Sequence, residues 1–201
     1  MKKASVSFLA LITLIGLVFG GFLLSSPSQT APSNTVDTAL LYRSNTPVSG
    51  NKNAQVKITV FSDYLCPYCS NANKIIEEIF SEYKDNVSIY HRSLIVHESS
   101  EILTRAALAA DKQGKFIEFN NILFEREIEA SQQTVEDIAT ELQMDIDKFR
   151  SDLNSSETTN TIDQDEEDAD NLQITGTPTI FVNDQRVEDF RELSSLVKDM
   201  V

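Results

Sequence analysis

Two cysteines, Cys66 and Cys69, constrain this chain more than any other feature, because they are the only cysteines among its 201 residues. The apolar run Val56–Phe61 before them predicts a buried strand, and the residues after Cys69 follow a helical period. Cys66 is therefore expected where a strand passes into a helix, with Pro67 at the helix start, where its missing N–H is not needed. Unpaired N–H groups at a helix start stabilise a thiolate. The pair is thus predicted to be a dithiol/disulfide redox centre.

A zinc site is the competing interpretation of a cysteine pair. Zinc usually takes about four ligands, most often thiolate or imidazole. Beyond the cysteines the chain offers only His91 and His97, whose spacing suits neither the usual pair of zinc-binding histidines nor one helix face. We therefore predict no metal site, and no cofactor other than the disulfide between Cys66 and Cys69.

The first residues have the pattern of an export signal. Lys2 and Lys3 precede an uncharged, largely apolar segment at residues 4–26. We expect residues 1–26 to be a signal peptide or, since the apolar stretch approaches the ~20 residues that span a bilayer, a membrane anchor that contacts the membrane. The lysines stay inside, so the domain is predicted to be extracytoplasmic, in the periplasm or on the outer face of the bacterial cytoplasmic membrane.

Residues 27–50 are rich in Ser, Thr, Pro and Asn and are predicted to form a flexible tether. The remaining residues, 51–201, suffice for one domain with its own core. A net charge of −14 argues against nucleic acid as a partner. Thiols outside the cytosol can be oxidised, so a redox pair there is typical of proteins that make, break or rearrange disulfides in other proteins.

The order of the predicted elements indicates an α/β fold. Strand Val56–Phe61, the helix after Cys69 and strand Val87–Arg92 form a βαβ unit with a right-handed crossover. After the helical segment described next, Thr179–Val182 and Gln185–Val187 predict a hairpin, and a final helix follows.

Helical periodicity dominates residues 98–172, between the second and third predicted strands. Thr134 is predicted to cap one helix in this segment. The acidic run from Asp163 to Asp170 is predicted to be a solvated helix face rather than a site for a basic partner.

Three motifs carry a resemblance to a known family. Phe61–Cys69 has the form F-x-D-Y-x-C-P-x-C, Gln113–Phe116 reads Q-G-K-F, and Gly176–Thr179 reads G-T-P-T. In these the chain resembles the DsbA-like thiol:disulfide oxidoreductases, which insert an all-helical subdomain into a thioredoxin-like fold. The resemblance runs from about Val48 to the C-terminus and implies a βαβ … ββα fold with an insertion at about 98–172.

The same resemblance implies roles near the cysteines. Pro178 would be cis and lie against the sulfurs, and Thr177 would offer its backbone to an extended substrate peptide. Many relatives carry a buried Glu six residues before the first cysteine, where this chain has Val60. The proton relay attributed to that Glu is therefore in doubt here.

The predicted chemistry is thiol–disulfide exchange. Cys66 is expected to be the exposed nucleophile, Cys69 the more buried resolving cysteine, and Pro67 and Tyr68 the residues that tune the redox potential. Asp63 is expected to be a loop or strand-end group without a role in proton transfer. His97 is expected to be a surface or capping residue.

Three function classes remain open on the sequence. The favoured one is an oxidase that transfers a disulfide to exported proteins and is recycled by a membrane redox partner. A reductase or isomerase is the alternative; an isomerase usually needs a dimerisation module, which the tether cannot supply, so a monomer is expected. A peptide-binding chaperone or scaffold without redox activity is the third.

Overall fold

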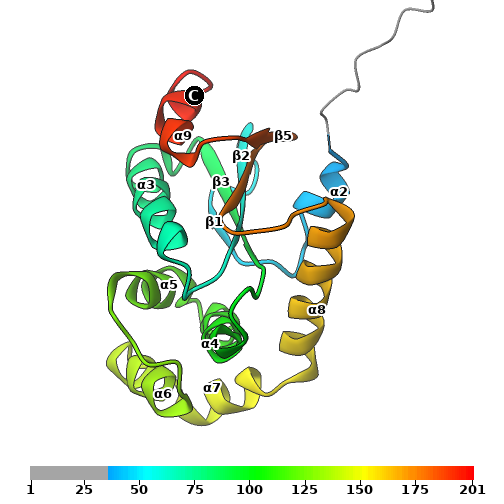
Figure 1. Ribbon diagram of the computed structural model, residues 1–201. Helices are drawn as coiled ribbons and strands as arrows, with labels where there is room; N and C mark the ends of the chain where they lie inside the picture. The colour runs from blue at the N-terminus through cyan, green and yellow to red at the C-terminus, as the bar shows by residue number, and fades with distance from the viewer. Residues whose placement is uncertain (1–35) are drawn as a thin grey trace, which may run out of the picture. The chain divides into compact units, whose positions relative to one another are not determined.

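A five-stranded mixed sheet lies at the centre of residues 36–201, the part of the chain that this computed structural model describes (Figure 1). The strands are β1 (Val48–Gly50), β2 (Val56–Ser62), β3 (Val87–Ser93), β4 (Thr179–Val182) and β5 (Gln185–Val187). Their order in the sheet is β1-β3-β2-β4-β5. Strands β2 and β3 run parallel, and the other neighbours are antiparallel. The predicted thioredoxin-like βαβ … ββα arrangement is confirmed.

Helix α3 (Pro67–Tyr83) joins the two parallel strands. It begins at Pro67, as predicted, and buries Ala72, Ile76 and Ile79 at helical spacing against the sheet. Helix α9 (Leu193–Lys198), preceded by the short 3₁₀ turn η2 (Phe190–Glu192), packs beside α3 on the same face. Complete burial of each large aliphatic side chain contributes about 1.5–3 kcal/mol, so this layer is the main support of the strand that leads to Cys66.

The opposite face of the sheet is covered by α2 (Thr38–Leu41) and α8 (Ser156–Asn171), as Figure 1 shows. Leu41, Phe61 and Phe181 meet there in a second apolar cluster. The rings of Phe61 and Phe181 pack edge to face with centroids 6.4 Å apart. Phe61, near the end of β2, thus packs the strand that leads to the cysteines against α8, the last helix of the insertion.

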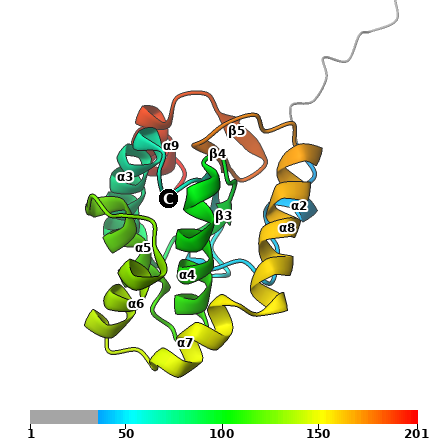
Figure 2. The same ribbon diagram turned by 60° about the horizontal axis from the view of Figure 1, so that its bottom comes forward.

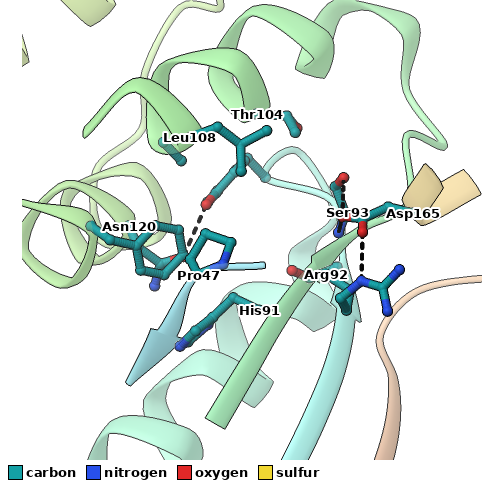
Figure 3. Close-up of a pocket in the computed structure, with 12 residues that line it drawn as sticks. Pro47, His91, Arg92, Ser93, Thr104, Leu108, Asn120 and Asp165 are labelled. Carbon is teal, nitrogen blue, oxygen red and sulfur yellow. Dashed lines mark hydrogen bonds and ion pairs between the residues drawn. The ribbon is translucent and has the colours of Figure 1, made fainter. Parts of the chain in front are cut away.

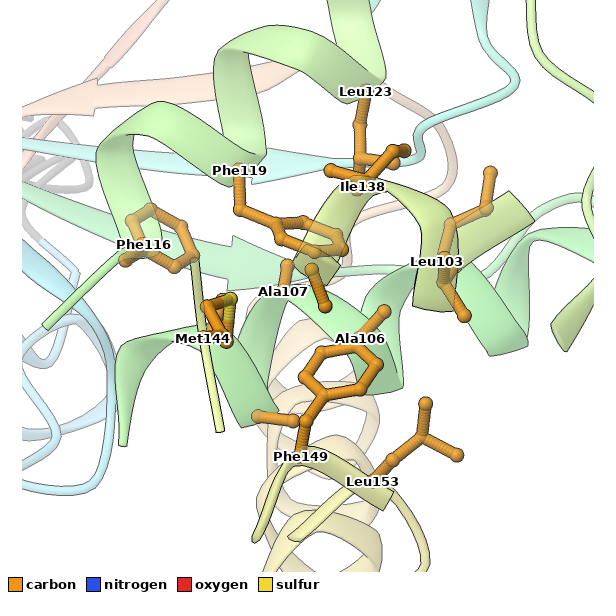
Figure 4. Packing of buried hydrophobic residues seen from close by; sticks show 14 residues of the cluster. Leu103, Ala106, Ala107, Phe116, Phe119, Leu123, Ile138, Met144, Phe149 and Leu153 are labelled. Atoms are coloured by element: carbon orange, nitrogen blue, oxygen red, sulfur yellow. The ribbon is translucent and has the colours of Figure 1, made fainter. Parts of the chain in front are cut away.

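The predicted insertion is confirmed as a set of helices between β3 and β4 (Figure 2). Its elements are the 3₁₀ turn η1 (Glu98–Ser100), α4 (Glu101–Asp111), α5 (Phe116–Glu125), α6 (Gln132–Glu141), α7 (Ile146–Leu153) and α8. Leu103, Phe119 and Phe149 are fully buried in a core of its own (Figure 4). The cap of α6 was predicted wrongly: Ser131 is the cap, because its Oγ accepts the N–H of Thr134 at 3.2 Å.

The predicted β4–β5 hairpin is confirmed and turns at Asn183-Asp184. Asn183 has a φ of 56°, a left-handed conformation that Asn tolerates well. Its side chain also accepts the N–H of Lys57 on β2 at 3.0 Å, so the turn is bonded to the neighbouring strand.

The prediction of a flexible tether at residues 27–50 is wrong from Val36 onward, because residues 36–50 belong to the folded domain. Thr38–Leu41 is helical, Leu41 is completely buried, and Val48–Gly50 pairs with β3 as the edge strand. Gly50 has a φ of +84°, and a side chain there would approach the carbonyl oxygen of Val87 to 2.4 Å. The polar composition concealed a segment that is held by a few apolar and backbone contacts.

The prediction that the acidic run on α8 is a solvated helix face is wrong for two of its residues. Asp163, Glu166, Glu167 and Asp170 are solvated as predicted, but Asp165 and Asp168 are buried. Arg92, a fully buried arginine on β3, donates to Asp165 at 2.5 Å and to Asp168 at 2.6 Å. Burial alone would raise the pKa of Asp168, but hydrogen bonds from Arg43 and Arg92 hold that pKa below its usual value. The two buried carboxylates therefore fasten α8 to the sheet.

The predicted signal or anchor segment, residues 1–26, lies outside the described residues, as does the tether up to residue 35. Within residues 36–201, no helix combines the length and the apolar composition needed to cross a membrane.

Candidate active site

The two cysteines lie where β2 passes into α3, as predicted. Cys66 is the N-cap of α3 with extended backbone angles, and its carbonyl accepts the N–H of Cys69 at 3.0 Å and of Ser70 at 3.3 Å. No side chain caps this helix end, and the positive end of the helix dipole lies on the Cys66 side. Both cysteines are free thiols.

The sulfurs differ in burial. Cys69 is 2% exposed and Cys66 is 8% exposed, so the predicted order holds, but Cys66 is far less open than expected. Both residues pack with Phe124, which the insertion supplies. Burial raises the pKa of the Cys69 thiol to about 12, although hydrogen bonds from the backbone of Asp63 and the side chain of Thr177 act to lower it. At neutral pH Cys69 is therefore a protonated thiol when reduced.

The loop before β4 brings Thr177 and Pro178 to the cysteines. The Thr177–Pro178 peptide bond is cis, as the resemblance implied. The Cys66 thiol donates to the carbonyl of Thr177, with Sγ and O 3.4 Å apart. Thr177 therefore meets one sulfur with its backbone and the other with its side chain. The substrate-binding roles of Thr177 and Pro178 remain predictions.

Asp63 has a larger structural role than a loop or strand-end position predicts. Its carboxylate is fully buried and accepts three backbone N–H groups, from Leu65 at 2.7 Å and from Val96 and His97 at 2.8 Å each. The ring of His97 lies 3.2 Å from the same carboxylate. The backbone carbonyl of Asp63 also accepts the N–H of Cys66 at 3.1 Å. Asp63 thus fixes the loop before Cys66 to the loop after β3.

A polar network ties α3 to the insertion. The Tyr64 hydroxyl donates to Asn120 Oδ1 at 3.0 Å, and Asn120 Nδ2 donates to Asn73 Oδ1 at 3.1 Å. Ser70 adds a hydrogen bond to the carbonyl of Phe124 at 2.9 Å. Burial strongly raises the pKa of Tyr64, which therefore stays a neutral donor. These bonds hold the aromatic wall of the insertion against the cysteines.

Tyr64 and Asn120 also line a cavity of about 20 Å³ between β3, α4 and α5 (Figure 3). That volume suffices for about one water molecule. In Figure 3 the Arg92–Asp165 ion pair and the Ser93–Asp165 hydrogen bond lie on one side of it and His91 on the other. The cavity is too small for a substrate, so it is a structural feature of the site.

Val60 is buried and apolar, in the position where many relatives have an acid. Its neighbour on β3 is His91, whose Nε2 lies 2.9 Å from Ser49 Oγ. Burial lowers the pKa of His91 to about 3, so the ring is neutral at physiological pH. Tyr68, which lies between the two cysteines in the sequence, is by contrast 66% exposed to solvent.

Comparison with known proteins identifies the family to which this fold belongs. The sequence profile of a family described as thioredoxin matches residues 43–199. The chain belongs to the thioredoxin family. A crystal structure of a thioredoxin-like oxidoreductase from Silicibacter pomeroyi DSS-3 is 31% identical, superposes with a TM-score of 0.73, and covers 82% of this chain and 97% of that one.

The DsbA-like resemblance is confirmed in the fold. The thiol-disulfide exchange protein α-DsbA2 from Wolbachia pipientis superposes with a TM-score of 0.73 at 22% identity, over 82% of this chain and 91% of that one. The matched residues therefore form a thioredoxin-family domain with the fold of a thioredoxin-like oxidoreductase.

A curated relative shows the same domain in a different protein. The chain is 33% identical over 141 residues to the Na(+)/H(+) antiporter NhaA 3 from Salinispora tropica. The match covers 69% of this chain but 22% of the antiporter, and the chain spans about a fifth to a third of the length of the curated relatives it matches.

Proposed function

We propose that this protein is an extracytoplasmic thiol:disulfide oxidase that transfers the Cys66–Cys69 disulfide to exported proteins. The observation that carries the proposal is the asymmetry of the two sulfurs. Cys66 caps α3 and bonds to the Thr177 carbonyl, whereas Cys69 is buried with a pKa raised to about 12. An attacking thiolate can reach Cys66 more readily than Cys69, and the displaced Cys69 sulfur must take up a proton as it leaves.

The proposed reaction begins with the oxidised pair. A substrate thiolate attacks Cys66 Sγ, the Cys66–Cys69 bond breaks, and the electron pair leaves on Cys69, which takes up a proton. A second substrate thiolate then attacks the substrate sulfur of the mixed disulfide and releases Cys66. Two electrons have passed from substrate to enzyme, and the substrate gains one disulfide. No cofactor beyond the cysteine pair takes part.

Thr177 and Pro178 form the proposed substrate-binding loop. A proline offers no N–H beside the sulfurs, and the adjoining Thr177 backbone can pair with an extended peptide as a strand would. Pro67 and Tyr68 are proposed to tune the redox potential, since they alone separate the two cysteines and Tyr68 is solvent-exposed.

Location and partners follow from the sequence pattern. The export-type segment 4–26 supports a site outside the cytoplasm, with the segment in contact with the membrane when it is not cleaved. An oxidase there needs a membrane redox partner that re-oxidises the pair after each cycle. The negative net charge supports protein substrates rather than nucleic acid, and the enzyme is proposed to act as a monomer.

An equilibrium redox titration of the purified full chain against glutathione buffers tests the direction of electron flow. We expect an oxidising potential, with the reduced form more resistant to urea than the oxidised form. A strongly reducing potential would support the reductase instead. A chain that binds unfolded peptides equally well after Cys66→Ser, and shows no reversible titration, would be the scaffold.

A further inference from the structure

A second and larger cavity lies on the flank of α3, in contact with α5 and the β1–β3 edge of the sheet. Its volume is about 240 Å³. Ile76 and Phe80 of α3, Ile89 of β3 and Ile117 of α5 give it apolar walls. Its volume lies below the usual range of about 300–1,000 Å³ for small-molecule sites and suits a single side chain.

Polar groups also line this cavity: Ser49 and His91 from the sheet edge, Asn120 and Asn121 from α5, and Asn73 and Glu77 from α3. Asn73 and Asn120 are 5% and 4% exposed and are bonded to each other across the two helices. Glu77 lines the cavity one turn beyond Asn73. Burial raises the pKa of Glu77, the carboxylate of Glu125 raises it further, and no basic side chain among residues 36–201 acts against this. The carboxylate is therefore a half-buried negative charge without a counter-ion in the described structure.

We propose that this cavity binds a lysine or arginine side chain of the substrate polypeptide while a substrate cysteine reacts at Cys66. The inference rests on the proposed function and adds a specificity site to it. A basic side chain has an apolar stem, which fits between Ile76 and Ile117, and a cationic head, which meets Glu77. Lysine and arginine add to the apolar stem a permanent positive charge that neutralises the Glu77 carboxylate.

The distance from the reacting sulfur sets the spacing that a substrate needs. Glu77 follows Cys66 by 11 positions along α3. At 1.5 Å per residue this is about 16 Å along the helix. An extended peptide advances about 3.3 Å per residue, so the basic residue is expected about five positions from the substrate cysteine. The net charge of −14 favours the approach of such a basic segment.

The test compares single-cysteine peptides that differ in one side chain. One peptide has lysine five positions from its cysteine, a second has norleucine there, and a third has lysine two positions away. The readout is the second-order rate constant at which the oxidised full chain consumes the peptide thiol. We expect the first peptide to react about two- to fivefold faster than the other two, the range of one solvent-accessible ion pair.

Two variants separate the cavity from general charge attraction. Glu77→Gln should reduce the lysine/norleucine rate ratio to about 1. Glu78→Gln removes the same charge from the next, exposed position of α3, and should leave both the ratio and the rates as they were. Equal rates for all three peptides with the native chain, or an equal loss in both variants, would overturn this inference alone. A native chain that consumes none of the peptides would overturn the proposed function as well.

Discussion

Burial separates the two sulfurs at the residue scale, although they are only three positions apart. Cys66 lies at the helix start, and Cys69 lies one turn inside against Phe124. Desolvation disfavours the charged form of the inner sulfur much more than the neutral form. The same helix therefore places Cys66 at its N-terminal end and keeps Cys69 as a thiol.

This asymmetry predicts the alkylation behaviour of single-cysteine variants. In Cys66→Ala, the remaining Cys69 should react with iodoacetamide more than 100-fold more slowly at pH 8 than a free cysteine. The reason is that burial raises its pKa to about 12, so little thiolate exists. Its rate should climb about tenfold per pH unit as long as the protein stays folded. Mass spectrometry of timed samples gives the rates.

Cys69→Ala is the matched variant for this experiment. It keeps Cys66 at the helix start and should be alkylated readily at pH 8. Urea-unfolded samples of both variants should react alike, because unfolding removes the difference in burial. Fast labelling of folded Cys66→Ala at pH 8 would contradict the assigned roles.

The sequence was sufficient to locate the cysteines and Pro178 but not the groups that hold them. A CxxC between a strand and a helix, and a G-T-P-T loop, are local patterns that a sequence displays directly. Asp63 acts through Val96 and His97, more than thirty positions away. No local sequence pattern indicates such distant partners, so the sequence predicts only a loop or strand-end position for Asp63.

Helix α8 shows the same limit at the element scale. The six acidic residues from Asp163 to Asp170 predicted a solvated face, and four of them are solvated. Because of the helical period, Asp165 and Asp168 lie on the side of α8 that faces the sheet, where they form ion pairs with Arg92 of β3. A single arginine in a strand otherwise rich in apolar and small residues was the available signal, because a buried arginine requires a carboxylate partner.

The Arg92 cluster should therefore control stability more than its single residue suggests. Arg92→Met leaves Asp165 buried without its cation, and removing one member of a buried pair costs about 3–5 kcal/mol. The side chain also donates to the carbonyl of Leu40 at 2.7 Å, which the variant leaves unpaired. The free energy of unfolding from urea titration measures the loss.

Arg126→Met is the control for this prediction. Arg126 makes a two-bond pair with Glu141, but both side chains are about half exposed. Its removal should change the free energy of unfolding much less, because water and salt already weaken an exposed pair. Equal losses in the two variants would show that the Arg92 cluster is solvated.

At the scale of the whole molecule, the element order and the insertion were predictable, whereas the start of the domain was not. Alternating and helical periods identify the long elements, from β2 through α9. Residues 36–50 contain one four-residue helix and one three-residue strand, which are too short for any period. Their place in the fold depends on contacts with β3 and α8 that only the folded chain reveals.

Those contacts predict that the domain begins before residue 50. A chain that starts at Asn51 should be less stable by several kcal/mol than one that starts at Asn34, since loss of a buried leucine such as Leu41 alone costs about 2–5 kcal/mol. The shorter chain also lacks Arg43, which bonds to Asp168 at 2.5 Å, and the β1 edge strand. Urea titrations followed by circular dichroism give the two midpoints.

Leu41→Ala in the longer chain separates packing from the rest of the segment. It should lower the midpoint by part of the truncation effect, because Arg43 and β1 remain in place. Since α8 rests on α2 and returns the chain to the loop that carries Thr177 and Pro178, the truncation should also alter the redox potential of Cys66–Cys69. Coincident midpoints for the chains starting at Asn34 and Asn51 would mean that residues 36–50 are a tether after all.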